Sequence, residues 1–505
     1  MSNGKRCYIT AAIDYANGAP HMGHAIEKIG IDAMARYRRL RGEPVHFLIG
    51  MDEHGLKVMQ SAEAAGMSPQ QWVDGIAAQF SAAWQRLSIS NDDFIRTTQP
   101  RHGPAVAEMI RRIADAGDLY RGRYEGYYCV GCEAFKRADE LVEEAGQPPR
   151  CPLHPTRDVV WTEEQNWFFR LSAYQDRLLK LLDERPDFVQ PDSRLNEIRR
   201  VIVDGLEDIS VSRSRLPWGV PWPGDESQTV YVWLDALTNY LSAIGFPDER
   251  YRQYWPADFH VIGKDITRFH CIYWPAFLMS ADVELPAHVW AHGFVTIGGG
   301  KLSKSEGVRV DLHDAIDRHG ADALRFFLLR EIPWNGDGEF SWERFDERYS
   351  SELADNFGNL ASRSIAMIER YRGGVVPAAA MTTLDADGAT ALLRYRAAMD
   401  AQLLHQGCAA AIQLSSAANQ FVDARAPWAQ AKDPALAAEL DCTLGALARC
   451  VAIVATLLFP FMPATMADLL GRLGFDPPPA LDDLAHLDLA GHSVHRGEVL
   501  FPKPR

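Results

Sequence analysis

The chain has little of what marks secreted, disulfide-bonded or membrane-spanning proteins. Only eight of its 505 residues are cysteine, and only three of these are clustered, which favours a reducing cytosol over a disulfide framework. We find no signal peptide and no apolar run long enough to span a bilayer. There is no internal repeat, and no low-complexity tract beyond short alanine-rich stretches. We therefore predict a cytoplasmic protein without a membrane partner.

The net charge has the wrong sign for a protein that coats nucleic acid. It is −15 at neutral pH, which argues against non-specific binding to a polyanion. A specific RNA partner is still compatible with this charge, because basic residues gather locally at 36–41 and at Arg199 and Arg200. A chain of this length is too long for one hydrophobic core, so we expect three or four domains.

A turn near the N-terminus has the character of a nucleotide site. Residues 14–24 are rich in glycine, proline and histidine, and they lie between a predicted strand at 7–13 and a helical pattern at 25–40. Free N–H groups and the positive end of a helix dipole can face phosphate in such a turn. Gly23 allows a nucleotide to approach the backbone, and His21 and His24 are candidate donors to a polyphosphate. The alternative is an ordinary turn whose histidines only cap the helix.

A second stretch, residues 298–305, reads Gly-Gly-Gly-Lys-Leu-Ser-Lys-Ser. Its lysines, Lys301 and Lys304, can clamp the β- and γ-phosphates of ATP, and its glycines allow the loop to close over the nucleotide. A basic loop alone is usually solvated surface. Together and in this order, however, the two stretches resemble the HIGH and KMSKS signatures of class I aminoacyl-tRNA synthetases.

Two further segments resemble the methionyl-tRNA synthetase family within that class. One runs from 45 to 60, where a predicted strand at 45–51 is followed by Asp52, whose carboxylate is expected to hold the amino group of the substrate. A loop in which Asp52 only caps is the alternative. The other runs from 230 to 240 and places Trp233, Ala236 and Tyr240 at i, i+3 and i+7, on one face of a helix. Such a stripe is more often core than binding site, but aromatic walls suit a thioether.

The resemblance also implies roles for individual residues. The methionine substrate would contact Ala12, Ile13, Tyr15, Asp52, Trp233, Ala236, Tyr240 and His270, for which core packing is the alternative at His270. ATP would contact Gly23, Glu27, Gly263, Lys264, Asp265, Val295, Ser303 and Lys304. The catalytic residues would be His21, His24, Lys301 and Lys304.

Three clustered cysteines and a histidine have the spacing of a zinc site. Cys129 and Cys132 form one pair of candidate ligands and Cys151 and His154 form another, with eighteen residues between the pairs. Three thiolates and one imidazole suit Zn²⁺ in a closed tetrahedral site, which we interpret as structural. Scattered cysteines beside a surface histidine are the alternative. By resemblance, this segment is the connective insert of the family.

The last third of the chain is predicted to be helical. Asn359 and Arg363, at i and i+4, share a helix face, and Trp428 lies far along the bundle. Recognition of unpaired bases needs stacking planes together with amide or guanidinium donors. Taken singly, these residues are better explained by capping and core packing. The resemblance, however, places them at positions that read the CAU anticodon of methionine tRNA.

The resemblance covers nearly the whole chain and implies an α/β fold. A class I Rossmann-like catalytic domain with a parallel sheet is split by the zinc-bearing insert and followed by an all-α anticodon-binding bundle. We predict the two catalytic halves at 1–115 and 226–325, the insert at 116–225, a linker that contacts the tRNA stem at 326–350, and the bundle at 351–505.

The implied activity is the ligation of L-methionine to tRNA. Methionine and ATP, with Mg²⁺, would give methionyl-adenylate, and the methionyl group would then pass to the 3′ end of elongator and initiator methionine tRNAs. Another class I synthetase, a small-molecule nucleotidylyltransferase and a non-catalytic tRNA-binding paralogue are the alternatives. A monomer is expected, because no appended oligonucleotide-binding domain follows the bundle.

Overall fold

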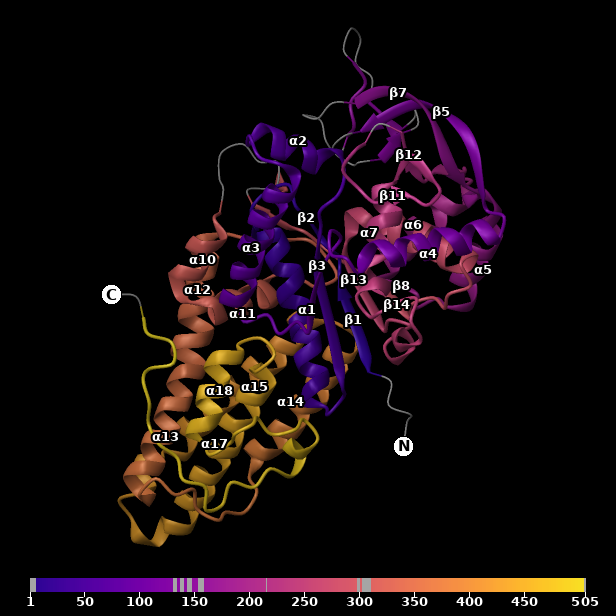
Figure 1. Cartoon of the computed structure of the whole chain (residues 1–505). Helices are drawn as coiled ribbons and strands as arrows, with labels where there is room; N and C mark the ends of the chain where they lie inside the picture. Colours follow the sequence, from indigo (N-terminus) through magenta and orange to yellow (C-terminus); the bar gives the residue numbers. More distant parts are fainter. Residues whose placement is uncertain are drawn as a thin grey trace. The chain divides into compact units, whose positions relative to one another are not determined.

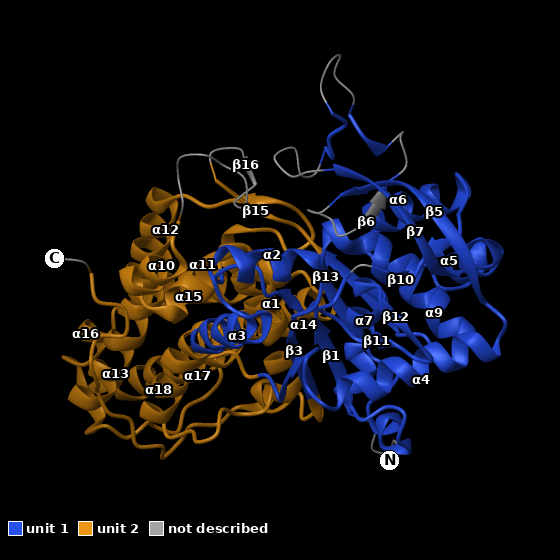
Figure 2. Ribbon diagram, turned by 45° about the horizontal axis from the view of Figure 1, so that its top comes forward, with its two compact units in different colours: residues 1–20, 46–82, 91–291 blue, residues 21–45, 83–90, 292–505 orange. Residues whose placement is uncertain are grey.

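The computed structural model describes residues 6–129, 134–136, 140–142, 148–152, 159–214, 216–297, 300–301 and 310–503. These residues divide into two compact units (Figure 2). The first unit combines 1–20, 46–82 and 91–291, and the second combines 21–45, 83–90 and 292–505. Each unit is therefore built from separate stretches of the chain. The predicted boundaries of the five segments remain predictions.

The first unit contains a parallel sheet with the strand order β2-β3-β1-β13-β14-β8, and β4 pairs with β3. Its strands are β1 (Cys7–Ala11), β2 (Asp14–Tyr15), β3 (Val45–Asp52), β4 (Asp93–Arg96), β8 (Val189–Gln190), β13 (Phe259–Gly263) and β14 (His288–His292). The pairs β1–β13, β2–β3, β3–β4 and β8–β14 are all parallel. Strands buried on both faces become nearly continuous apolar runs, as β3 does.

The strand order places a ligand-binding edge next to β1. The chain continues from β1 to β3 on one side of it, whereas β13 lies on the other side. In open α/β sheets, ligands bind at the carboxyl ends of the strands where the order reverses in this way. Residues that follow β1, β3 and β13 are therefore brought to one edge (Figure 1).

An antiparallel region interrupts the parallel sheet. Its larger sheet has the order β6-β5-β7-β9, with β5 (Leu119–Cys129), β6 (Ala134–Lys136), β7 (Val159–Phe169) and β9 (Ile209–Ser210). A smaller sheet contains β10 (Ser212–Arg213), β11 (Pro221–Trp222) and β12 (Asp225–Val230). The helices of this unit include α2 (Leu56–Ala64), α4 (His102–Asp115), α5 (Gln175–Glu184), α6 (Asp192–Val203), α7 (Val232–Leu237), α8 (Asn239–Ser242) and α9 (Trp274–Ser280). Helix α3 (Pro69–Arg86) continues into the second unit.

The second unit is mainly helical, as the sequence predicts for the last third of the chain. Its helices are α1 (Met22–Leu40), α10 (Leu312–His319), α11 (Ala321–Glu331), α12 (Trp342–Arg348), α13 (Asn359–Arg372), α14 (Thr383–Asp400), α15 (Leu404–Arg425), α16 (Pro427–Gln430), α17 (Ala437–Leu458) and α18 (Pro463–Arg472). A small sheet pairs β15 (Val295–Ile297) with β16 (Gly300–Lys301) and β17 (Gly338–Glu339). A buried ion pair of 2.7 Å between Asp32 on α1 and Arg325 on α11 joins the early helix to the later ones.

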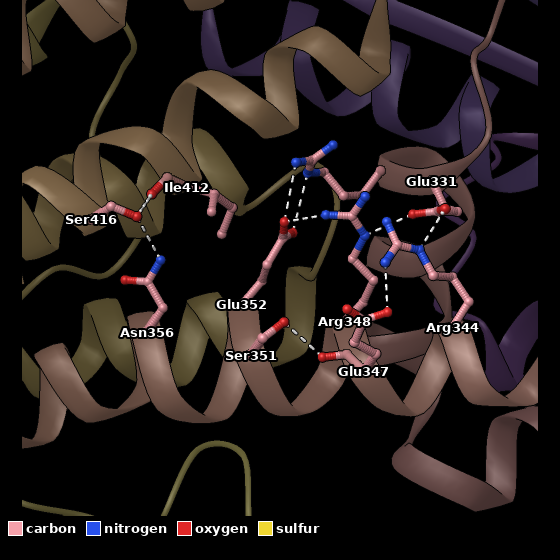
Figure 3. A network of polar contacts seen from close by, with 10 residues as sticks. Glu331, Arg344, Glu347, Arg348, Ser351, Glu352, Asn356, Ile412 and Ser416 are labelled. Carbon is pink, nitrogen blue, oxygen red and sulfur yellow. Dashed lines mark hydrogen bonds and ion pairs between the residues drawn. The ribbon is translucent and has the colours of Figure 1, made fainter.

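A ladder of ion pairs anchors the helix that leads into the bundle. Helix α12 continues through a π-helical stretch, η6 (Tyr349–Gly358), into α13. Arg344 and Arg348 contact Glu331 at 2.8 and 2.7 Å. Arg348 also reaches Glu352, which pairs with Arg330 at 3.1 Å (Figure 3). These ion pairs thereby fix helix α11 to helix α12 and to the start of η6.

One sequence-based expectation is wrong. Residues 434–458 are long and apolar enough to cross a membrane by length and composition, although we expected no such run. In the folded chain, however, 89% of the most apolar window is buried inside the protein. These residues include α17, which forms part of the core of the helical unit. The run is apolar because it is a core helix. A count of apolar residues cannot distinguish a buried core helix from a membrane-spanning one.

Candidate active site

A pocket of about 80 Å³ lies in the first unit, at the carboxyl edge of the parallel sheet. It is lined by Ala12, Ile13, Tyr15, Asp52, Trp233, Ala236, Leu237, Asn239, Tyr240, Ile266 and His270. All eight residues that the resemblance assigns to methionine are among them. They come from the ends of β1 and β3, from β2, from α7 and α8, and from the π-helical turn η5 (Phe269–Tyr273) with the residues just before it. Leu237, Asn239 and Ile266 also line the pocket, and no separate motif pointed to them.

A pair of hydrogen bonds fixes one end of the pocket. The Tyr240 hydroxyl lies 2.7 Å from Nε2 of His270, and Nδ1 of His270 lies 3.1 Å from the carbonyl oxygen of Ile266. A carbonyl can only accept, so Nδ1 carries a proton, and in the neutral form of the ring Nε2 accepts the Tyr240 proton. The hydroxyl proton of Tyr240 is thus committed to the ring of His270. The π-helical turn, a form that is frequent at functional sites, aims this histidine at the pocket.

Aromatic rings form another wall. Trp233 stacks on Phe269 with ring centroids 3.5 Å apart and an interplanar angle of 4°. Tyr15 meets Trp233 edge to face at 6.3 Å. Flat, polarizable surfaces of this kind favour an unbranched apolar or thioether side chain.

A buried carboxylate ties the pocket wall to the loop after β3. Asp235, between Trp233 and Ala236 on α7, lies 2.7 Å from Nδ1 of His54 and 2.7 Å from Nε2 of His102. The side chain of Asp235 is fully buried. Sequence reasoning missed this cluster, because His102 is far from both partners along the chain. The only signal was that Asp235 and His54 each lie within two residues of a predicted pocket position.

The cluster shifts the acidity of its members. Burial alone would raise the pKa of Asp235, but the charges and hydrogen bonds of His54 and His102 outweigh it and hold this pKa well below its usual range. Burial would lower the pKa of His54, yet the charge and hydrogen bond of Asp235, helped by Glu53, raise it. Near neutral pH, the Asp235 carboxylate is therefore ionised, and its charge moves the titration of His54 to higher pH.

The loop that carries Asp52 has further anchors. The Glu53 carboxylate accepts from Arg96 at 2.5 Å and from the hydroxyl of Thr98. The indole N–H of Trp218 donates to the carbonyl of Glu53 at 2.6 Å. Asp52 itself is buried at the edge of the sheet, with an exposed fraction of 2%. The position of Asp52 is therefore supported by the anchored residue that follows it, Glu53.

The two histidines of the N-terminal turn belong to the second unit and cap helix α1. His21 is the N-cap residue, and its Nδ1 accepts from the N–H of Gly23 at 3.1 Å. The N–H of His21 donates to Nδ1 of His24 at 3.3 Å, which completes a reciprocal capping box. The two rings stack with their centroids 3.7 Å apart. Both histidines therefore cap the helix, and their predicted catalytic role stays a prediction.

Capping also fixes how these histidines can act on a ligand. Because both Nδ1 atoms accept backbone protons, each neutral ring carries its proton on Nε2. Burial, with His21 and Lys28 nearby, lowers the pKa of His24 well below its ordinary value, so this ring is neutral at pH 7. A side chain at position 23 would have its Cβ only 3.0 Å from the ring of His21. Glycine there leaves room for the histidine cap itself.

The residues that the resemblance assigns to ATP are spread over both units. Gly263, Lys264 and Asp265 lie at the end of β13 and the start of a short 3₁₀ turn in the first unit. In the second unit, buried Glu27 pairs with Lys28 at 2.7 Å and His292 at 3.0 Å. Val295 lies on β15 and Lys301 on β16. Ser303 and Lys304 lie outside the described residues.

The predicted anticodon residues share one face of the helical unit. Asn359 begins α13 and is exposed, and Arg363 follows one turn later. The Arg363 guanidinium lies 5.9 Å from the ring centre of Trp428 and 3.7 Å from Asp423. The side chain of Trp428 is 42% exposed, so it is not the core anchor that a lone tryptophan would suggest.

Of the four predicted zinc ligands, Cys129 and Cys151 are described, whereas Cys132 and His154 lie outside the described residues. Both described cysteines are fully buried and pack in one small cluster with Leu141. Among the described residues, no group of three or more histidine, cysteine or acidic side chains could hold a metal ion. The described pair is compatible with the predicted ligand set.

Replacing Asp235 by asparagine should destabilise the first unit in a pH-dependent way. Removing one partner from a buried ion pair costs about 3–5 kcal/mol of unfolding free energy. The raised pKa of His54 means that its contribution is complete below about pH 6.5 and is lost as the pH rises through the raised value. The lowered pKa of Asp235 keeps the carboxylate ionised throughout this window. The stability gap between wild type and Asp235→Asn should therefore be larger at pH 6 than at pH 9 in urea denaturation.

Glu249→Gln, at an exposed position, serves as the control for this comparison. Its unfolding free energy should stay close to that of the wild type at both pH 6 and pH 9. A gap for Asp235→Asn that is the same at both pH values would contradict a role for His54 protonation.

The sequence matches two family descriptions along its length. The description "tRNA synthetases class I (M)" matches residues 7–158 and 138–365. The description "Anticodon binding domain of methionyl tRNA ligase" matches residues 373–504. Together they cover both the sheet-bearing and the helical parts of the chain.

Relatives of known function agree with these matches. The methionine–tRNA ligase of Caldanaerobacter subterraneus subsp. tengcongensis is 42% identical over 99% of this chain and 79% of its own length. The methionine–tRNA ligase of Streptomyces coelicolor is also 42% identical, over 99% of this chain and 97% of its own. Mycobacterium tuberculosis methionyl-tRNA synthetase in complex with methionyl-adenylate is 41% identical, covers 99% of this chain and 100% of its own, and superposes with a TM-score of 0.95.

These findings establish the fold and the reaction. The parallel-sheet catalytic domain and the helical anticodon-binding domain are those of a class I synthetase. The enzyme activates L-methionine with ATP and transfers it to tRNA. The chain belongs to the methionyl-tRNA synthetase family.

Proposed function

We propose that the pocket at the carboxyl ends of β1 and β3 holds the methionine substrate while its adenylate forms. The observation that supports this most directly is that eight positions from separate segments, each implied by sequence, line one small pocket. The buried carboxylate of Asp52 would pair with the α-ammonium group, because an ion pair compensates the burial of both charges. Trp233 and Tyr15 would flank the side chain.

The far end of the pocket explains how a thioether would be preferred. The hydroxyl proton of Tyr240 is used in the hydrogen bond to His270. The two side chains would therefore offer the ligand aromatic surface but no further hydrogen-bond donor. Glutamine has nearly the same shape as methionine, but its amide would have to give up hydrogen bonds to water. Polar groups left poorly paired in a buried site cost about 1–3 kcal/mol each. The pocket would therefore reject glutamine.

The adenylation step would use the residues that the resemblance assigns to ATP and to catalysis. A carboxylate oxygen of methionine attacks the α-phosphorus of ATP, which is bound with Mg²⁺, and the bond to pyrophosphate breaks. We propose that the Nε2–H groups of His21 and His24 donate to the phosphates as charge develops, with Lys301 and Lys304 closing over them. In the second step, a ribose hydroxyl of tRNA attacks the methionyl carbonyl and AMP leaves.

Tyr240→Phe tests the assignment of the pocket. The change removes the hydroxyl group that donates to Nε2 of His270. This buried nitrogen is then left without its partner, at a cost of about 1–3 kcal/mol. The KM for methionine in ATP–pyrophosphate exchange should rise roughly tenfold, with little change in kcat. Discrimination against glutamine should fall in parallel.

Tyr251→Phe is the matched control, because this tyrosine is equally buried but lies outside the pocket. If Tyr240→Phe and Tyr251→Phe give the same KM as the wild type, the pocket does not bind the methionine side chain.

We also propose that Cys129, Cys132, Cys151 and His154 hold one structural zinc ion. The support is the paired spacing in the sequence and the burial of Cys129 and Cys151 in one cluster. When bound, the ion would cross-link the end of β5 to the segment near 151. A four-ligand site leaves no open position for water, so no catalytic step is assigned to it.

Metal analysis of protein purified without chelator should show about one zinc per chain. Cys132→Ala should lose the metal and become sensitive to protease within residues 116–225, because structural zinc sites couple binding to local folding. Cys442→Ala, which removes a cysteine from the helical unit, should retain both the zinc and the protease resistance. Wild-type protein that contains no zinc would rule out the proposed zinc site.

We propose that Asn359, Arg363 and Trp428 read the CAU anticodon. The support is that Arg363 and the exposed ring of Trp428 lie together on one surface, with Asn359 one turn away. An exposed indole offers a stacking plane for an unpaired base, and the guanidinium and amide offer edge contacts.

A monomeric state and a cytoplasmic location remain proposals drawn from the sequence.

Trp428→Ala should separate charging from activation. Loss of stacking on one base costs about 1–3 kcal/mol, so charging of CAU-anticodon tRNA should fall roughly tenfold to a hundredfold in kcat/KM. Methionine-dependent pyrophosphate exchange needs no tRNA and should remain unchanged. The ratio of charging on CAU tRNA to charging on a changed-anticodon tRNA should shrink.

Leu393→Ala, at another highly exposed apolar position of the helical unit, should leave this ratio at the wild-type value. An unchanged ratio in well-folded Trp428→Ala would disprove the anticodon role of the tryptophan.

A further inference from the structure

A second, larger pocket of about 360 Å³ lies in the first unit, outside the methionine pocket. It is formed by β5, β7, the loop 205–210 and the turn η5. We call it the aromatic pocket, because its lining includes Tyr124, Tyr127, Trp161, Tyr231 and Tyr273, together with Arg268. None of the proposed roles above uses these residues.

The aromatic pocket shares short chain segments with the methionine pocket. Tyr231 lines the aromatic pocket, and Trp233, two residues later, lines the methionine pocket. Likewise, Arg268 lines one and His270 the other. Phe269, between them, stacks on Trp233. A molecule in the aromatic pocket would therefore lie next to the site where methionyl-adenylate forms.

The rings offer stacking surfaces that are open to solvent. Trp161 is 55% exposed and meets Tyr127 edge to face at 5.0 Å. The Arg268 guanidinium lies 5.9 Å from the ring centre of Tyr273. Aromatic and guanidinium planes of this kind are the usual partners of unpaired nucleobases.

The polar groups favour a base over a phosphate. Carboxylates outnumber cations in the lining, with Glu125, Glu140, Glu207 and Asp208 against Lys136 and Arg268. Nη1 of Arg268 donates to Glu140 at 2.8 Å, so the pocket presents a guanidinium donor beside a carboxylate acceptor. Nε of Arg268 is buried with no hydrogen-bond partner within the described part of the chain.

A donor beside an acceptor is complementary to the edge of cytosine. A carboxylate accepts from the N4 amine of cytosine, and a guanidinium donates to N3 or O2. Uracil places a carbonyl oxygen where the amine would be, and two acceptors then oppose each other. The unpaired 3′ end of a tRNA has two cytosines before its terminal adenosine.

We propose that the aromatic pocket binds one of these unpaired cytosines while the terminal adenosine receives the methionyl group. This inference rests on the transfer reaction of the family and adds a subsite to it. Stacking on the exposed face of Trp161 would hold the base, and the Arg268–Glu140 pair would read its edge. Positioning the neighbouring nucleotide would place the ribose hydroxyl near the adenylate.

Trp161→Ala tests the stacking surface. Trp161 is more than half exposed and lies outside the methionine pocket, so the fold and the activation step should tolerate its loss. The kcat/KM for tRNA charging should fall roughly tenfold, as for the loss of one stacked base. Methionine-dependent pyrophosphate exchange should match the wild type. Val160→Ala, at the adjacent exposed position outside the aromatic pocket, should change neither activity.

Substituted tRNA transcripts test the base itself. Replacing each of the two cytosines in turn by uridine should reduce charging by wild-type enzyme at one of the two positions. With that transcript, Trp161→Ala should cause little further loss, because the contact is already broken. A full additional loss would show that the tryptophan and the base act independently, which overturns the proposal.

Two other results would also overturn it. Trp161→Ala could charge the normal tRNA at the wild-type rate, or it could lose pyrophosphate exchange and charging together. Failure of the methionine-site proposal would be seen elsewhere, because Tyr240→Phe would then leave the KM for methionine unchanged in exchange assays without tRNA.

Discussion

The carboxylate of Asp235 joins two walls of the 80 Å³ pocket that we propose for methionine. It lies on the helix that carries Trp233 and Ala236, and it reaches His54, two residues beyond Asp52. The amino end and the side-chain wall of the pocket are thus joined through one buried ion pair. Shortening or displacing this contact would move both walls, although Asp235 itself does not line the pocket.

The N-terminal histidines show that a structural role and a functional role can reside in one residue. Their Nδ1 atoms satisfy backbone donors of helix α1, which would otherwise be left without partners. The same hydrogen bonds direct the ring protons to Nε2, where a phosphate could accept them. Capping and the proposed catalytic role are therefore compatible, because they use different nitrogens of each ring. Capping is what prepares His21 and His24 for the proposed role.

Much of the fold could be predicted from local patterns, as the apolar run ending at Asp52 predicts a buried parallel strand. The pocket was predicted from the family resemblance, because the helical spacing of Trp233, Ala236 and Tyr240 alone fits a core face equally well, and all three residues do line one pocket. The aspartate–histidine cluster could not be predicted, because its members meet only through long-range packing. The apolar run at 434–458 was missed in the sequence, and only the fold shows that it is a buried core helix. Lys304, Cys132 and His154 keep their predicted roles as proposals.

The most direct test of the account is ATP–pyrophosphate exchange measured separately with each of the twenty amino acids. The enzyme should support rapid exchange with methionine, and exchange with glutamine and leucine should be lower by at least about a hundredfold, as expected for a pocket that penalises polar and branched side chains. The lining residues of the 80 Å³ pocket would then account for both activation and selection. Faster exchange with any other amino acid than with methionine would contradict the account.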